Sequence, residues 1–254
     1  MPKKNFFNLL YALWYLLWFW VIFILIYPLF LLTIFVKKWR PYSYKVNNIW
    51  AYTVYFLVGL PVKVQYRFPF DKKGNYVFCP NHNSYLDIPI LGYAMRQFGV
   101  YVGKSQLSKV PLFGYMFKKL YISVDRNSLR DRYQSFELAK NEIDQGNSLI
   151  IFPEGGTNQN PPVPKRFKDG AFRIAIEKQV PIVPVTIPQH WLVMHDISPY
   201  LHWSKIEVIF HEPIATTGMT IDQADDLKEQ VYSVIYNEMK SRFPKYFEKE
   251  TVNK

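Results

Sequence analysis

An apolar run without charge dominates the beginning of the chain. No charged residue occurs between Lys4 and Lys37, and residues 9–35 are almost wholly apolar. This run exceeds the ~20 residues that a helix needs to cross the core of a bilayer. It is too long for the apolar part of a signal peptide and contains no small-residue cleavage site, so we expect it to stay in the mature protein. Pro28 lacks a backbone donor and predicts a bend or a reversal of the helix.

The residues that flank this run predict how it meets a membrane. Basic residues stand at both ends, so the positive-inside rule assigns no direction to a single span. A second stretch, residues 44–60, is rich in aromatic side chains that favour a membrane interface. We therefore expect a re-entrant or monotopic pair of helices with both ends on the cytoplasmic face. The alternative is a buried helix of a soluble protein, but the helices of globular proteins are far shorter.

Beyond Pro61, short apolar runs alternate with mixed helical stretches, which is the pattern of an α/β fold. The expected strands are residues 62–66, 76–79, 100–103, 121–124, 148–152, 182–187 and 206–210. The expected helices are residues 87–98, 112–119, 128–145, 170–178 and 220–242, the last opening on a capping-box pattern. Prolines make residues 159–168 an irregular loop. The sequence predicts a mixed sheet flanked by helices over residues 61–254, preceded by membrane-embedded helices in residues 1–60.

Composition narrows the kind of partner. The chain has 254 residues, and its 31 lysines and arginines exceed its 20 aspartates and glutamates by 11. This surplus favours nucleic acid, an acidic membrane or a phosphorylated substrate. We expect no nucleic acid, because the aromatic residues gather in the N-terminal run instead of alternating with lysine and arginine. The single cysteine excludes a disulfide framework within the chain, which agrees with a cytoplasmic globular part.

One histidine stands where an α/β sheet gathers its chemistry. His82 follows the apolar strand 76–79, and active sites of such sheets lie at the carboxyl ends of strands. Asp87, five positions on, is able to bind one imidazole nitrogen and fix the tautomer. Such a pair activates a substrate hydroxyl directly, which indicates group transfer rather than a hydrolase triad. The alternative is structural, because Ser84 and Asp87 also match a helix cap.

A second apolar strand ends in a polar glycine turn. Residues 149–152 lead into Pro153, Glu154, Gly155, Gly156 and Thr157. Glycines let the backbone approach a ligand, and exposed N–H groups of such a turn bind a phosphate or a developing oxyanion. Glu154 would then bind polar groups of an acceptor or order the loop. An ordinary turn explains the same residues without any ligand.

Basic residues lie near the predicted strand ends and in the proline-rich loop. They are Lys104, Arg126, Lys165, Arg166 and Lys168. Such residues bind phosphates, although isolated lysines and arginines are more often solvated surface.

Other reactive residue types are better explained by structure. Four further histidines, at positions 190, 195, 202 and 211, lack a compact spacing with cysteines or carboxylates, so we expect no metal site. Cys79 lies close to His82 but inside an apolar strand, where cysteine behaves as a small hydrophobic residue rather than a nucleophile.

Taken together, these residues resemble the glycerolipid acyltransferase family. The resemblance covers roughly residues 77–188 and comprises four motifs in order, in residues 81–87, 103–126, 152–157 and 180–185. Residues 167–171 also resemble the family's segment after its third motif. By this resemblance, residues 61–254 form an acyltransferase catalytic domain.

The resemblance implies a role for each motif. His82 would deprotonate an acceptor hydroxyl, and Asp87 would orient it. The acceptor's phosphate would be bound by Lys104, Arg126 and the turn Glu154, Gly155, Gly156 and Thr157. One position departs from the family, which reads Glu-Gly-Thr-Arg where this chain has an extra glycine and then Asn158. We expect Arg166, or else Lys165, to replace the missing arginine; alternatively, the acceptor carries a different head group.

The expected function is transfer of a fatty acyl group from acyl-CoA or acyl carrier protein to the free hydroxyl of a lysophospholipid. The leading acceptor is 1-acylglycerol-3-phosphate, in phospholipid biosynthesis at a membrane. No cofactor is expected, because a thioester is already activated. The alternatives are a different lyso-lipid, transacylation between phospholipids, or a non-catalytic protein that binds anionic lipid through basic patches.

Overall fold

A single seven-stranded sheet organises the globular part of the chain, in the order β1-β7-β6-β2-β5-β3-β4. The computed structural model describes residues 5–69, 71–125, 127–195 and 198–248. The strands are β1 (Val62–Tyr66), β2 (Val77–Pro80), β3 (Gly99–Lys104), β4 (Ile122–Val124), β5 (Ser148–Ile151), β6 (Ile182–Thr186) and β7 (Ile206–Phe210). All neighbours are parallel except β6 and β7. The predicted mixed sheet is confirmed, and no strand end differs from its predicted position by more than one residue.

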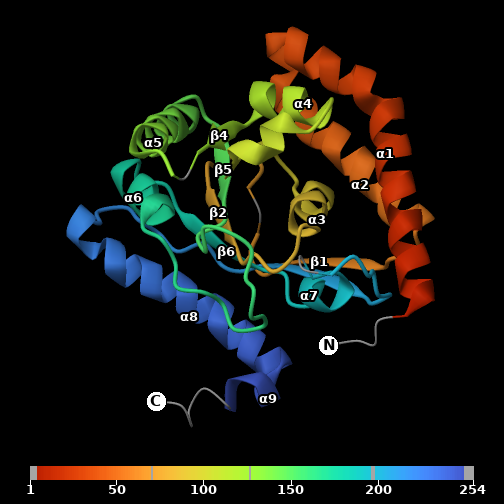
Figure 1. Ribbon diagram of the computed structural model, residues 1–254. Helices are drawn as coiled ribbons and strands as arrows, with labels where there is room; N and C mark the ends of the chain where they lie inside the picture. Colours follow the sequence, from red (N-terminus) through yellow and green to blue (C-terminus); the bar gives the residue numbers. More distant parts are fainter. Residues whose placement is uncertain (1–4, 70, 126, 196–197, 249–254) are drawn as a thin grey trace.

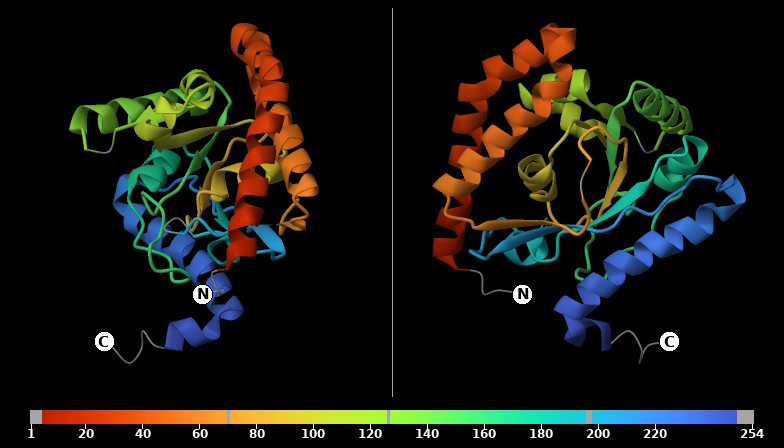
Figure 2. Two further views of the ribbon diagram at one scale, coloured as in Figure 1. Left: turned by 45° about the vertical axis from the view of Figure 1, so that its right-hand side comes forward. Right: turned by 180° about the vertical axis from the view of Figure 1, so that it is seen from behind.

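Helices cover both faces of the sheet, so the central strands β2 and β6 are buried along their whole length. One face carries α5 (Leu129–Asp144), α6 (Gly170–Glu177) and α8 (Ala224–Arg242). The other carries α1 (Phe6–Phe35), α2 (Ser43–Leu57), α3 (Asp87–Ala94) and α4 (Phe113–Leu120). In β2, Val77 and Cys79 pack in the core beneath α5, α6 and α8, whereas Phe78 packs in the core beneath α1 to α4. The result is three layers, seen edge-on in Figures 1 and 2.

Local polar contacts set the ends of the longer helices. At the start of α5, the Ser128 hydroxyl accepts the Asp131 N–H at 3.1 Å. Gly146 follows the helix with φ +84°, a conformation that favours glycine. Thr220 and Gln223 form the predicted capping box ahead of α8.

Helix α3 ends at Ala94, earlier than the predicted residue 98. The Asn48 amide of α2 lies within hydrogen-bond distance of the carbonyl oxygens of Gly92, Tyr93 and Met95. It therefore caps the free carbonyls of α3, a contact between distant segments that the local pattern does not contain. The pattern did not predict four short helices, η1 (Lys37–Tyr42), η2 (Ser105–Lys109), α7 (His190–Val193) and α9 (Pro244–Phe247). The predicted helix 220–242 begins with a further short helix, η3 (Ile221–Gln223).

Helices α1 and α2 form a hairpin along one side of the molecule (Figure 1). Helix α1 continues through Pro28, so the chain does not reverse there. Its axis bends toward the C-terminal end (Figures 1 and 2), and the chain turns back at Val36 and η1. The Trp50 indole of α2 donates to the Phe19 carbonyl oxygen of α1 at 3.0 Å. Arg40 in the turn pairs with Glu142 of α5 at 2.7 Å, which fastens the hairpin to the sheet.

The outer face of α1 is apolar and exposed. Phe23 and Phe30 are fully buried on its inner face, whereas Leu17 and Leu25 are 53% and 69% exposed. By length and composition, α1 is able to cross a membrane. One apolar core nevertheless includes α1, α2 and the sheet, and the division into residues 1–60 and 61–254 stays a prediction.

Candidate active site

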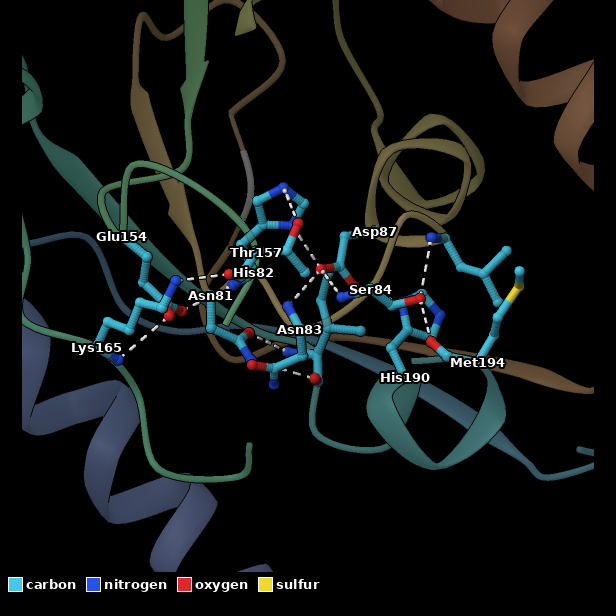
Figure 3. A network of polar contacts seen from close by, with 12 residues as sticks. Asn81, His82, Asn83, Ser84, Asp87, Glu154, Thr157, Lys165, His190 and Met194 are labelled. Carbon is cyan, nitrogen blue, oxygen red and sulfur yellow. Dashed lines mark hydrogen bonds and ion pairs between the residues drawn. The ribbon is translucent and has the colours of Figure 1, made fainter. Parts of the chain in front are cut away.

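The carboxyl ends of β2, β3, β4, β5 and β6 meet at one edge of the sheet, because these strands are parallel to one another. His82 follows β2, Lys104 ends β3, Glu154 follows β5 and His190 opens α7 after β6. Figure 3 shows three of these residues converging at this edge. The fold thus places residues from distant motifs together.

The loop that carries His82 is clamped to the segment after β6. The Asn81 amide accepts the Ile187 N–H at 2.7 Å and donates to the Ile187 carbonyl oxygen at 3.3 Å. Farther along, the Ser84 hydroxyl donates to the Met194 carbonyl oxygen at 2.6 Å. Both ends of the loop that carries His82 are therefore held by residues 187–194.

His82 and Asp87 are in direct contact. The imidazole Nδ1 lies 2.9 Å from Asp87 Oδ2. The same carboxylate oxygen accepts the N–H groups of Asn83 at 2.7 Å and Ser84 at 2.9 Å. The Asp87 carboxylate therefore does two things: it binds the imidazole of His82, and it accepts backbone N–H groups just before α3.

A second histidine reaches the other carboxylate oxygen. His190 Nδ1 lies 2.6 Å from Asp87 Oδ1, and both residues are fully buried. Burial by itself raises the pKa of Asp87, but the hydrogen bonds from His190 and His82 outweigh it and hold this pKa below its usual value. The carboxylate is therefore ionised at neutral pH.

The free side of the His82 ring faces a small pocket. The ring stacks on Phe152 with centroids 4.2 Å apart, and Nε2 lies 3.5 Å from the Thr157 hydroxyl. The pocket has a volume of about 60 Å³, and its lining includes Lys104 and Gly103. A substrate hydroxyl that enters here meets the nitrogen that Asp87 leaves free.

Glu154 joins the glycine turn to the catalytic loop. Its carboxylate oxygens accept the N–H groups of His82 at 2.8 Å and Lys165 at 3.2 Å. Burial raises the pKa of Glu154 to about 8, against the effect of these two hydrogen bonds. These contacts fit the loop-ordering role of Glu154.

Gly155 adopts φ +70°, and a Cβ there would come within 2.7 Å of Lys168 Cε. This left-handed backbone conformation favours glycine, and the Lys168 side chain lies against the turn.

The structure distributes the predicted basic residues unequally. Lys104 lines the pocket, Arg166 is exposed on the loop, and Arg126 lies outside the described residues. Lys165 Nζ donates to the Thr157 carbonyl oxygen at 2.6 Å. Asn158, at the position of the family arginine, donates to the Val163 carbonyl oxygen at 2.6 Å and is buried within the loop. The phosphate-binding roles of Lys104, Arg126 and Arg166 stay predictions.

An apolar cavity of about 380 Å³ lies beside the pocket, between α1, α2, α3 and α4. Residues that line both spaces are Tyr85, Ile88, Tyr101, Leu107 and Phe117. The walls are almost entirely apolar and aromatic, which suits a hydrocarbon chain. The site thus combines the carboxylate-held imidazole of His82 with an apolar cavity.

The remaining candidates stay with the core. Cys79 is fully buried, and burial raises the pKa of its thiol far above the usual value, so the reactive thiolate is disfavoured. Within the described part of the chain, no group of three or more His, Cys, Asp or Glu side chains is arranged to hold a metal ion. His190 is the contact that the sequence reasoning missed, and the adjacency of β6 to β2 is the signal that would have placed it near His82.

The site places an imidazole held by a buried carboxylate beside an apolar cavity at the carboxyl edge of an α/β sheet. This arrangement suits an enzyme that activates a hydroxyl in an apolar substrate. The Acyltransferase family profile matches residues 61–188. The chain belongs to this family and is an acyltransferase.

Named relatives agree with this family assignment. The 1-acyl-sn-glycerol-3-phosphate acyltransferase of Haemophilus influenzae is 30% identical over 199 residues, which are 76% of this chain and 80% of that protein. The enzyme of the same name from Limnanthes douglasii is 26% identical over 210 residues, covering 80% of this chain and 74% of that protein. The crystal structure of the 1-acyl-sn-glycerophosphate (LPA) acyltransferase PlsC from Thermotoga maritima has the same fold, with a TM-score of 0.75 and 22% identity over 92% of this chain and 95% of that chain.

Proposed function

We propose that this acyltransferase transfers a fatty acyl group from acyl-CoA or acyl carrier protein to the free hydroxyl of 1-acylglycerol-3-phosphate. The observation that carries the proposal is the His82 imidazole, which is held by Asp87 and opens on a pocket that adjoins the apolar cavity. The names of the relatives support the acceptor. Acylation of this acceptor would be a step of phospholipid biosynthesis at a membrane.

The proposed reaction needs one proton transfer in each direction. His82 Nε2 takes the proton of the acceptor hydroxyl while the hydroxyl oxygen attacks the thioester carbonyl carbon. N–H groups of the glycine turn stabilise the resulting oxyanion. The C–S bond then breaks, and the thiolate takes the proton from His82. Asp87 stays ionised throughout and holds the imidazolium. The thioester is already activated, so the proposed reaction uses no cofactor.

A lipid-product analysis tests this proposal. The purified protein is offered lyso-lipids that differ in head group, with acyl-CoA or acyl carrier protein as donor. The proposed function predicts a diacyl product from the phosphate-bearing lyso-lipid. A product only from another head group would instead support a different lyso-lipid acceptor, the alternative suggested by Asn158 at the position of the family arginine.

The cavity predicts selectivity for acyl-chain length. Gly92 lines the cavity, so Gly92→Leu is expected to fill part of it and to shift the preferred donor toward shorter chains. Loss of room for two methylenes should lower kcat/KM for the longest accepted donor roughly tenfold, at ~0.8 kcal/mol for each buried methylene. Initial rates with a series of saturated donors measure the shift.

Gly92→Ala is the matched control. A Cβ at this position lies 3.6 Å from Asn47 Cβ, an ordinary contact, so the alanine variant should keep the wild-type chain profile. An unchanged profile in the leucine variant would place the acyl chain outside this cavity.

We further propose that the protein is bound to a membrane through α1 and α2, with its catalytic domain on the cytoplasmic face. Leu17→Glu with Leu25→Glu puts charge on the exposed apolar face of α1 and leaves the buried Phe23 and Phe30 in place. Each charge costs ~2.5–3.5 kcal/mol in a bilayer, so the variant should leave the membrane fraction. Fractionation after expression measures this.

Leu129→Glu, on an exposed position of α5, is the control and should stay with the membrane. Recovery of the wild-type chain as a soluble monomer without detergent would refute the membrane proposal.

A further inference from the structure

His190 lies at the centre of the site, although it belongs to none of the motifs found in the sequence. It opens α7, which follows β6, and β6 pairs with β2 directly below His82. Figure 3 shows His190 on the far side of Asp87 from His82. Its side chain is fully buried, and its Nδ1 lies 2.6 Å from Asp87 Oδ1.

The two carboxylate oxygens of Asp87 have separate partners. Oδ2 accepts from His82 Nδ1 and from the N–H groups of Asn83 and Ser84. Among the described residues, the hydrogen bond to Oδ1 comes from His190. His190 therefore fixes the rotation of the carboxylate and shares its charge with His82.

Burial defines the tautomer of His190. Its Nε2 is buried and has no hydrogen-bond partner in the part of the chain that the structure describes. An imidazolium would place a charged N–H there without an acceptor, which is costly in an apolar surrounding. The neutral ring with its proton on Nδ1 leaves only an unpaired acceptor. His190 is thus a neutral donor to Asp87.

The segment that carries His190 is held by hydrogen bonds at both ends. Ile187 is paired with the Asn81 side chain, and the Met194 carbonyl oxygen accepts the Ser84 hydroxyl. The Met194 N–H in turn donates to the His190 carbonyl oxygen at 2.9 Å. The same loop that positions His82 therefore positions His190 as well.

We propose that His190 is a positioning residue for acyl transfer: it orients Asp87 and limits how strongly this carboxylate stabilises the protonated form of His82. The inference rests on the proposed role of His82 as the base. A base must be unprotonated to accept the hydroxyl proton, so excessive stabilisation of its protonated form lowers activity on the acidic side. His190 thus keeps His82 competent toward lower pH.

The charged and titratable groups around His82 come from several elements. They are Asp87 of α3 with Tyr55 of α2 acting on it, Glu154 and Lys165 from the glycine turn and its loop, Lys104 at the end of β3, Tyr85 and Tyr101 in the pocket wall, and His190 itself. The His190 variants leave all these other groups unchanged. Any shift of the pH profile is therefore attributed to the change at His190.

The test measures kcat/KM for acyl transfer as a function of pH in the full-length protein. His190→Leu removes the donor, and we expect roughly a 10- to 100-fold loss, because hydrogen bonds to charged groups are typically worth that much. The acidic limb of the profile should also move up by about one pH unit, because Asp87 then acts more fully on His82. His190→Asn keeps an N–H near the position of Nδ1 and should restore most of the rate and the wild-type limb.

Trp191→Phe is the control for damage to α7, because the Trp191 Nε1 has no hydrogen-bond partner among the described residues. It should leave the profile unchanged. A loss in His190→Leu that is equal at every pH, or an asparagine variant with a displaced limb, would overturn the positioning role. The asparagine result alone decides the matter if the leucine variant does not fold. Absence of acyl transfer in the wild-type protein would instead refute the proposed function.

Discussion

Replacing His82 with alanine is expected to lower kcat for acyl transfer by about 10²–10⁴-fold, the usual contribution of a general base. His82 Nε2 faces the pocket, and the other ring nitrogen is held by Asp87. No other imidazole among the described residues lines this pocket. The measurement is the initial rate of thiol release with saturating acceptor and donor.

Folding must be separated from chemistry in this variant, because the His82 ring also stacks on Phe152. The unfolding midpoint of the variant should therefore be recorded beside its rate. His202→Ala is the matched control, since His202 is half-buried and does not line the pocket. Near wild-type turnover in a folded His82→Ala protein would disprove the proposed mechanism.

Asp87→Asn should lower kcat by a similar factor while the protein still folds. The amide has one oxygen and one NH₂ group, but both Asp87 oxygens now accept hydrogen bonds from imidazole nitrogens. One histidine must therefore lose its acceptor or change its tautomer. In Ser-His-Asp enzymes, the corresponding change costs ~10⁴-fold in kcat.

The pH dependence distinguishes this explanation from general damage. Loss of the carboxylate charge removes the stabilisation of protonated His82, so the acidic limb of kcat should move to lower pH in Asp87→Asn. The Asn83 and Ser84 N–H groups retain an acceptor if the amide oxygen takes the position of Oδ2. A variant with full activity would show that Asp87 serves only as a helix cap.

Long, strongly patterned segments were predictable from the sequence. The strands β1 and β7 have the predicted bounds, because apolar residues alternate with polar ones along β1 and β7 is apolar except for Glu207. Helix ends that depend on distant residues were not predictable. The end of α3 is an example, because it is capped by Asn48 of α2. Helix α1 also passes through Pro28, since packing against α2 outweighs the loss of one backbone donor.

In the candidate site as well, local contacts were predictable from the sequence and contacts between distant segments were not. The contact between His82 and Asp87 spans five residues and follows from local sequence. His190 lies 103 positions from Asp87, and only the pairing of β6 with β2 brings it there. In the proline-rich loop, sequence order could not tell which cation faces the glycine turn; the structure places Lys168 against Gly155 and exposes Arg166.

The most direct test of the central claim is a rapid-quench measurement of thiol release from the acyl donor in the absence of acceptor. If His82 acts as a base on the acceptor hydroxyl, the acyl group passes directly between substrates. Direct transfer predicts no initial burst of thiol. Thiol release should begin only when lyso-lipid is added, with one diacyl product for each thiol. A burst equal to the enzyme concentration would reveal an acyl-enzyme intermediate and contradict direct transfer.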